Sequence, residues 1–181
     1  MKEIEVKAKL RNRNEVIKKL AELDCRLSDP FFQSDQIFVP KHINSLPADT
    51  GVPVLRIREA KGKFILTMKI RLTNGLDKQE SETEITNPVA MKEIILAAGY
   101  KPMVAFKKER RKGKYNDWEV CVDEVEGLGS FIEVEQMSED GNSEEIQTEL
   151  FKFLQSLGVT ESDREHFGYD VILYLKQKNG S

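Results

Sequence analysis

Charged residues at alternate positions are the part of this sequence that could do chemistry. At the start of the chain, Glu3, Glu5 and Lys7 alternate with Ile4 and Val6. Successive side chains of an extended strand lie on opposite faces, so this segment would have one charged face and one apolar face. Such a charged face could simply meet water, as is common in antiparallel sheets. It could also line a polar cavity, and one strand alone leaves both interpretations open.

The same alternation recurs along the chain, with acids and bases largely on separate segments. The basic positions are Arg56 and Arg58, then Lys69 and Arg71, then Lys108, Arg110 and Lys112. The acidic positions are Glu80, Glu82 and Glu84, then Glu119 and Asp123, then Glu133 and Glu135. Soluble surfaces usually mix both signs of charge along each element. The segregation therefore favours a binding site over a solvated surface.

Four segments show the apolar periodicity of amphipathic helices. The sequence predicts them over residues 12–24, 87–99 and 142–158 and from about Ser162 onward. The first three begin at asparagines suited to capping a helix N-terminus. Their apolar stripes must be buried, and burying strand carboxylates beneath them would cost several kcal/mol each. We therefore expect the helices to pack on the uncharged faces of the strands.

The helices must bury their apolar stripes, and the charged faces of the strands must stay solvated. A sheet with helices outside can do both by curling into a barrel with a wet, charged interior. The predicted fold class is therefore α+β, with an antiparallel β-barrel and helices packed outside. The 181 residues are within the range of one hydrophobic core. We expect a single domain over residues 1–181.

Composition excludes several classes of function. The net charge of −3 gives no attraction to nucleic acid or to an anionic membrane. The sequence has no run of about 18 apolar residues and opens on a strand pattern, so we expect a cytoplasmic protein without a membrane partner. Cys25 and Cys121 lie far apart and are expected to be reduced thiols. His42 and His166 are the two histidines, too few for a histidine metal cluster.

Acids and bases that share one cavity must be compensated. They could neutralise each other directly. Alternatively, the bases could bind a polyanion and the acids a divalent cation. Arginine suits phosphate through its planar fork, and Mg²⁺ or Mn²⁺ prefers carboxylate and phosphate oxygens. The second solution predicts a metal-assisted phosphate site.

Several motifs in a fixed order carry a family resemblance. They are E-x-E-x-K over 3–7, R-x-R over 56–58, Lys69, E-x-E over 82–84, K-x-R over 108–110, and the run from Asp123 to Glu135. This set resembles the CYTH superfamily, also called the triphosphate tunnel metalloenzymes. The resemblance implies an eight-stranded antiparallel tunnel in which bases bind a triphosphate and acids hold Mg²⁺ or Mn²⁺.

The resemblance also implies roles for individual residues. The implied metal ligands are Glu3, Glu5, Asp123, Glu133 and Glu135. The implied substrate ligands are Lys7, Arg56, Arg58, Lys69, Lys78, Lys108 and Arg110. Glu5, Lys7 and Asp123 are the expected catalytic residues. Lys78 stands where many members have arginine, which keeps the charge but loses the bidentate geometry. Glu82 and Glu84 could bind metal or pair with bases.

The function implied is that of a metal-dependent enzyme acting on a small-molecule triphosphate. The length and the run from Gly127 to Glu135 look closest to class IV adenylyl cyclases, which convert ATP to cyclic AMP and pyrophosphate. One alternative is a triphosphatase acting on thiamine triphosphate, inorganic triphosphate or nucleoside triphosphates. Another is a barrel that binds polyphosphate without catalysis. Many members of the superfamily are dimers, so a homodimer is compatible with the resemblance.

Overall fold

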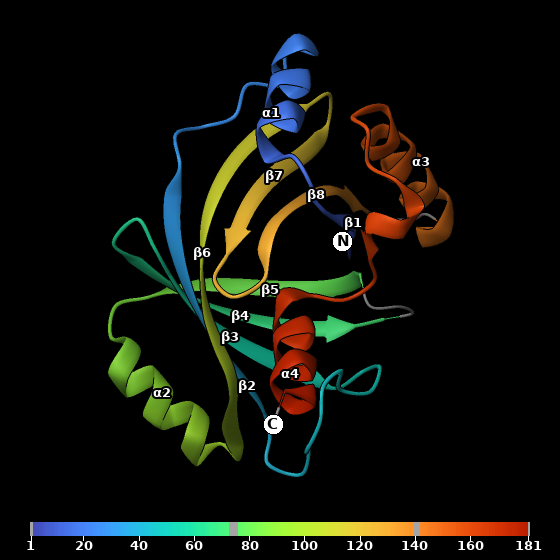
Figure 1. Cartoon of the computed structure of the whole chain (residues 1–181). Helices are drawn as coiled ribbons and strands as arrows, with labels where there is room; N and C mark the ends of the chain where they lie inside the picture. The colour runs from blue at the N-terminus through green and yellow to red at the C-terminus, as the bar shows by residue number, and fades with distance from the viewer. Residues whose placement is uncertain (1, 73–75, 140–141, 181) are drawn as a thin grey trace. The chain divides into compact units, whose positions relative to one another are not determined.

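The computed structural model describes residues 2–72, 76–139 and 142–180 (Figure 1). The strands are β1 (Lys2–Lys9), β2 (Phe31–Pro40), β3 (Pro53–Ala60), β4 (Lys63–Arg71), β5 (Asp77–Ile85), β6 (Tyr100–Tyr115), β7 (Trp118–Val125), β8 (Gly129–Ser138) and β9 (Arg164–Glu165). The helices are α1 (Arg13–Glu22), α2 (Pro88–Ala97), α3 (Ser143–Ser156) and α4 (Tyr169–Asn179), with a 3₁₀ turn η1 (Glu161–Asp163).

The chain forms two compact units. The first contains Met1–Phe31 and Lys108–His166, and the second contains Phe32–Lys107 and Phe167–Ser181. The long strand β6 belongs to both, because the boundary falls between Lys107 and Lys108.

The first unit is an antiparallel sheet covered on its apolar face by two helices. Its strands follow the order β6-β7-β8-β1-β9. Helices α1 and α3 pack on this sheet through one core. That core contains Val6, Ala8, Val16, Leu20, Val120, Val122, Ile132, Val134, Leu150 and Leu154. The charged residues of β1, β7 and β8 alternate with these apolar ones, so they occupy the other face, as the sequence predicted.

Asparagine caps fix where the helices of this unit begin. The Asn12 side chain accepts a hydrogen bond from the Glu15 amide at 3.3 Å, and that of Asn142 accepts one from the Glu144 amide at 3.1 Å. Each cap satisfies an amide that the first turn leaves without a helical partner. The predicted helices at 12–24 and 142–158 are therefore confirmed.

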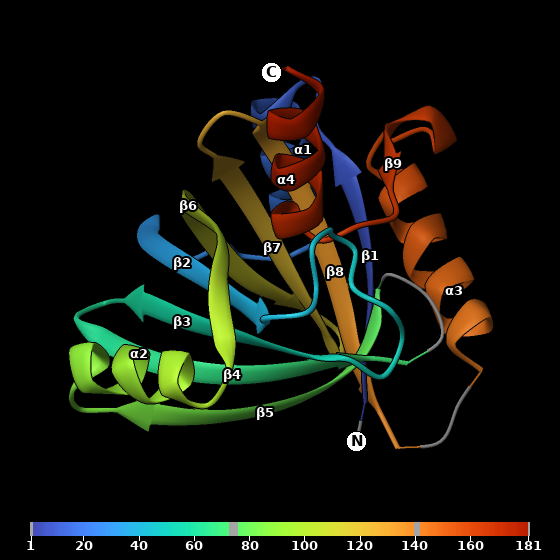
Figure 2. The same ribbon diagram turned by 90° about the horizontal axis from the view of Figure 1, so that it is seen from below.

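The second unit repeats the arrangement. Its strands follow the order β5-β4-β3-β2-β6. Helix α2 lies along the sheet, with Ile95 packed against Phe38, Ile57 and Ile85 (Figure 2). Helix α4 meets β6 where the edge of the Tyr169 ring approaches Phe106, with ring centroids 6.2 Å apart. Arginines, lysines and carboxylates occupy the sheet face opposite α2.

The predicted α+β class is confirmed: eight antiparallel strands have eight residues or more, and helices pack on their apolar faces. The last helix was predicted wrongly, because it begins at Tyr169 and not near Ser162. Thr160 and Asp163 do form a capping box, but it starts only the turn η1. The chain then pairs as β9 with Lys7 and Ala8 before α4 begins. Within the described ranges, no helix is long and apolar enough to cross a membrane.

Candidate functional site

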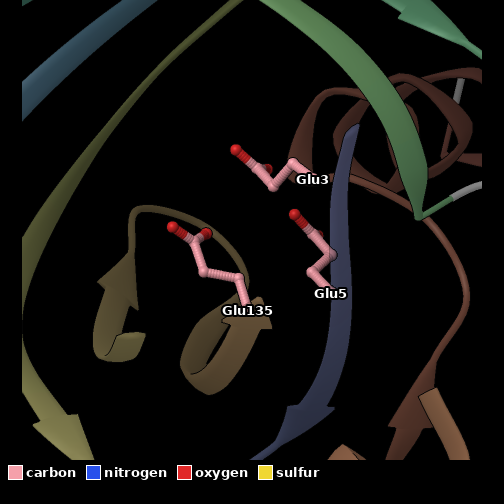
Figure 3. A group of neighbouring side chains, drawn as sticks. All are labelled: Glu3, Glu5 and Glu135. Carbon is pink, nitrogen blue, oxygen red and sulfur yellow. The ribbon is translucent and has the colours of Figure 1, made fainter. Parts of the chain in front are cut away.

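Three glutamates converge on the charged face of the first unit. Glu3 and Glu5 are alternate residues of β1, and the register places Glu135 of β8 opposite Glu5. Carboxylate oxygens of all three lie within 4.8 Å of one another, and their side chains point toward one another (Figure 3). Oxygen ligands at this spacing suit a hard divalent cation such as Mg²⁺ or Mn²⁺.

The electrostatics of this acidic cluster also fit a cation. Burial raises the pKa of Glu135 to about 9, and the negative charges of Glu3, Glu119 and Glu5 contribute to the rise. At neutral pH the Glu135 carboxyl is therefore protonated when no cation compensates it. A divalent cation would favour its ionised form, because a bound ion reverses the effect of the neighbouring carboxylates. The spacing and the charge of these three carboxyl groups therefore fit a divalent metal ion.

A buried network of ion pairs continues from the acidic cluster along the same face. The Lys7 Nζ lies 3.3 Å from Glu5 Oε1 and 3.0 Å from Glu133 Oε1. Arg110 also contacts Glu133 through a direct ion pair. Burial alone would raise the pKa of Glu133, but the positive charges of Lys7 and Arg110 hold that pKa well below its usual range. Glu133 is therefore a carboxylate at neutral pH.

Asp123 anchors the far end of this network. Its two oxygens accept hydrogen bonds from Arg110, at 2.7 Å from Nε and 2.6 Å from Nη2. The Lys108 Nζ donates to the same carboxylate at 3.0 Å. Burial would lower the pKa of Arg110, but Glu133 and Asp123 raise it well above its ordinary value. Arg110 and Asp123 thus form a buried, bidentate, charge-assisted pair.

The second unit carries a base-rich cluster on its own charged face. Arg58 makes a bidentate pair with Asp35 of β2, at 2.7 Å and 2.6 Å. Arg56 donates to Thr67 at 3.0 Å and to Glu82 at 3.1 Å. Its Nε atom is buried without a hydrogen-bond partner in the part of the chain that the structure describes. Burial, together with the charge of Arg58, lowers the pKa of Arg56.

Two lysines complete this base-rich cluster. Lys69 forms an ion pair with Glu80, and the Lys78 Nζ lies 3.8 Å from a Glu80 oxygen. Four bases then share the face with three acids, namely Arg56, Arg58, Lys69 and Lys78 with Asp35, Glu80 and Glu82. The guanidinium and ammonium groups of this cluster are suited to bind an anion.

The predicted site residues therefore fall into distinct groups. Glu3, Glu5 and Glu135 form the acidic cluster as a metal site would require. Asp123 and Glu133, also expected to bind metal, instead pair with Lys7, Lys108 and Arg110. All seven expected substrate ligands lie on a charged face, Lys78 included. Glu82 forms an ion pair with Arg56, and Glu84 forms one with Lys63 at 2.8 Å. Of the two alternatives given for these glutamates, both therefore show the pairing with a basic side chain.

Three residues of these networks were not predicted from the sequence. Asp35 belongs to β2, where four consecutive polar residues, from Gln33 to Gln36, give no alternation that would have indicated its face. Thr67 accepts from Arg56 and donates to Glu82 at 2.8 Å. Glu80 was recognised as part of an acidic strand but not as the partner of Lys69. Partners of this kind depend on strand register, which a pattern within one strand does not contain.

Cys121 lies on the charged face of the first unit but is unsuited to nucleophilic catalysis. Its side chain is fully buried, and burial raises the pKa of its thiol. A thiol acts as a nucleophile only when it ionises. The chemistry available is therefore that of carboxylates, lysines and arginines.

Comparison with known proteins agrees with this geometry. The model of the CYTH domain family matches residues 1–169. A Methanocaldococcus jannaschii protein named "Putative adenylate cyclase" is 30% identical over 168 residues, which are 90% of this chain and 93% of that protein.

Solved structures share the fold. A conserved hypothetical protein from Pyrococcus furiosus is 27% identical and superimposes with a TM-score of 0.78, covering 93% of this chain and 98% of its own. A second structure is that of a Hippeastrum protein, described as a "putative adenylyl cyclase" with a dominant triphosphatase activity. It is 18% identical and superimposes with a TM-score of 0.63, covering 98% of this chain and 95% of its own. The second likeness concerns the fold alone. The chain belongs to the CYTH domain family.

Proposed function

We propose that this chain is a metal-dependent enzyme that acts on a small-molecule triphosphate and converts ATP to cyclic AMP and pyrophosphate. The observation that carries the proposal is the acidic cluster of Glu3, Glu5 and Glu135, which continues directly into a network of buried bases. Family membership and the name of the Methanocaldococcus jannaschii relative support it. We propose further that residues 1–181 act as a single domain.

The acidic cluster would hold Mg²⁺ or Mn²⁺. Such an ion, when bound, supplies charge neutralisation at the phosphates and lowers the pKa of an attacking oxygen. Glu133 and Asp123 are the further proposed ligands. Their oxygens become available when phosphate groups draw Lys7 and Arg110 away, because phosphate competes for the same N–H donors.

The bases of each unit are the proposed phosphate ligands. They are Lys7, Lys108 and Arg110 in the first unit and Arg56, Arg58, Lys69 and Lys78 in the second. The arginines offer paired donors to phosphate oxygens, and the lysines offer point charges. Alignment and charge neutralisation then account for most of the expected rate enhancement.

Three residues are assigned catalytic roles. Glu5 would hold the cation, and Lys7, which contacts both Glu5 and Glu133, would neutralise charge that develops on the phosphate. Asp123 would fix the orientation of the Arg110 fork. In the proposed reaction the ribose 3′-hydroxyl attacks the α-phosphorus and pyrophosphate leaves.

A triphosphatase is the second candidate, because the acidic cluster and the bases would contact a cation and phosphate groups whichever group carries the triphosphate. The same residues would bind the substrate, and water would attack the terminal phosphorus to give orthophosphate. The two reactions differ in the nucleophile.

Product analysis distinguishes these candidates. The protein is incubated separately with ATP, thiamine triphosphate and inorganic triphosphate in Mg²⁺ or Mn²⁺, and the products are separated by chromatography. Equal amounts of cyclic AMP and pyrophosphate from ATP would support the cyclase. Orthophosphate without cyclic AMP would overturn the cyclase in favour of the triphosphatase. Absence of any product from all three substrates would contradict both.

A further inference from the structure

Helix α3 is joined to the strand of the acidic cluster by a buried hydrogen bond. The side-chain amide of Gln147 donates from Nε2 to the main-chain oxygen of Glu5, at 3.2 Å. Gln147 is 7% exposed and Glu5 is 4% exposed. A hydrogen bond buried to this degree is costly to leave unmade, because the carbonyl oxygen has lost its contact with water.

The strand pairing explains why Gln147 can reach this carbonyl. The Leu10 amide donates to the Ser130 carbonyl of β8 at 2.8 Å. Main-chain groups alternate between the two edges of a strand, so Glu5 directs its carbonyl to the edge away from β8. On that edge β9 pairs with Lys7 and Ala8. Gln147 binds the same edge of β1 two residues closer to the N-terminus.

A second contact aligns α3 along the strand. The Lys2 Nζ donates to the Ser143 hydroxyl at 3.0 Å, and Ser143 is 7% exposed. Ser143 and Gln147 are four residues apart and therefore lie on one face of the helix. Helix α3 thus binds β1 on both sides of Glu3, and both ribbon views show it beside this strand (Figures 1 and 2).

We infer that Gln147 is a positioning residue for the metal ligand Glu5. Repulsion among the three carboxylates, whose oxygens lie within 4.8 Å of one another, tends to push β1 away from β8. The Gln147 bond fixes the main chain of Glu5 from the helix side and so keeps its carboxylate within reach of the shared cation. The inference rests on the proposed metal-dependent function, and it gives α3 a part in metal binding.

The test is the affinity for Mn²⁺, measured by electron paramagnetic resonance without turnover. Gln147→Met keeps the length of the side chain but removes the donor, and Gln147→Leu does so with a different shape. Loss of a group that supports a metal ligand typically weakens metal binding about 10- to 100-fold. We expect a loss of that size in both variants. Binding of inorganic triphosphate without metal should change less than about twofold, because the Gln147 side chain bonds the main chain of Glu5, which is a proposed metal ligand and not a proposed phosphate ligand.

Gln155→Met is the matched control, since Gln155 lies exposed on the same helix. It should retain the wild-type affinity for Mn²⁺. Unchanged Mn²⁺ affinity in folded Gln147→Met or Gln147→Leu would overturn the inference, as would an equal loss of triphosphate binding. Failure of both variants to fold would also overturn it, by making Gln147 a determinant of folding. If the wild-type protein bound no Mn²⁺ at all, the proposed function itself would fail.

Discussion

At the scale of single residues, Glu135 shows an electrostatic cost of placing carboxyl groups together in the acidic cluster. Its pKa is raised from 4.5 to about 9 by burial and by Glu3, Glu119 and Glu5. Between these two pH values the folded protein binds a proton that the unfolded chain has released. The unfolding free energy therefore decreases as the pH rises through this window, because the folded state binds more protons.

Glu135→Gln tests this cost directly. We expect the variant, studied in EDTA, to lose the decrease in unfolding free energy that the wild type shows between about pH 5 and pH 9, because glutamine imitates the protonated carboxyl. Denaturant unfolding at several pH values measures the slope. Glu22→Gln, at an exposed position of α1, is the control and should keep the wild-type slope. An identical slope in Glu135→Gln would contradict the assignment.

Asp123 lies in a buried network of ion pairs, where its negative charge compensates Arg110 and Lys108. Asp123→Asn would leave Arg110 and Lys108 without their shared carboxylate in a buried position. Breaking a buried ion pair from one side typically costs about 3–5 kcal/mol of unfolding free energy. We expect urea unfolding at neutral pH to show a loss of unfolding free energy in this range for Asp123→Asn. Glu126→Gln, which changes an exposed turn residue, should lose almost none. A loss as small as that of the control would show that the network does not hold the fold.

At the scale of secondary-structure elements, caps make the helix boundaries predictable. The Asn87 side chain accepts a hydrogen bond from the Ala90 amide at 3.0 Å at the start of α2. Asn87→Ala should reduce the unfolding free energy by about 1 kcal/mol, the usual cost of a lost cap. Glu93→Ala, exposed within α2, is the control and should unfold at nearly the wild-type urea concentration. A cap variant as stable as the control would mean that α2 does not depend on Asn87.

Short-range patterns explain which elements could be predicted. Alternation predicted the charged and apolar faces of β1, and asparagine caps predicted where α1, α2 and α3 begin. The pairing of β9 with β1 could not be predicted in this way, because it depends on residues more than 150 positions apart. Asp35 was not recognised as the partner of Arg58, because that pair depends on the register between β2 and β3.

At the scale of the whole molecule, each unit has an antiparallel sheet with helices on the apolar face and charges on the other. Composition and alternation were sufficient to predict this division of faces. They were not sufficient to predict which carboxylates pair with bases: Glu133 and Glu135 share a strand and a face, yet Glu133 binds Lys7 while Glu135 joins the acidic cluster. Two residues along β8 therefore separate the ion-pair partner of Lys7 from a member of the acidic cluster.

The acidic cluster is proposed to make triphosphate chemistry depend on a divalent cation. The most direct measurement is turnover of ATP and inorganic triphosphate by the wild type and by Glu5→Gln, across a titration of Mn²⁺ or Mg²⁺ and in EDTA. Glu22→Gln again serves as the matched control. We predict that EDTA abolishes turnover by the wild type. Glu5→Gln should remain folded and still bind triphosphate. Its turnover should decrease by more than the roughly 100-fold expected when a residue that supports a metal ligand is lost. Turnover that persists in EDTA, or that Glu5→Gln leaves unchanged, would contradict the account.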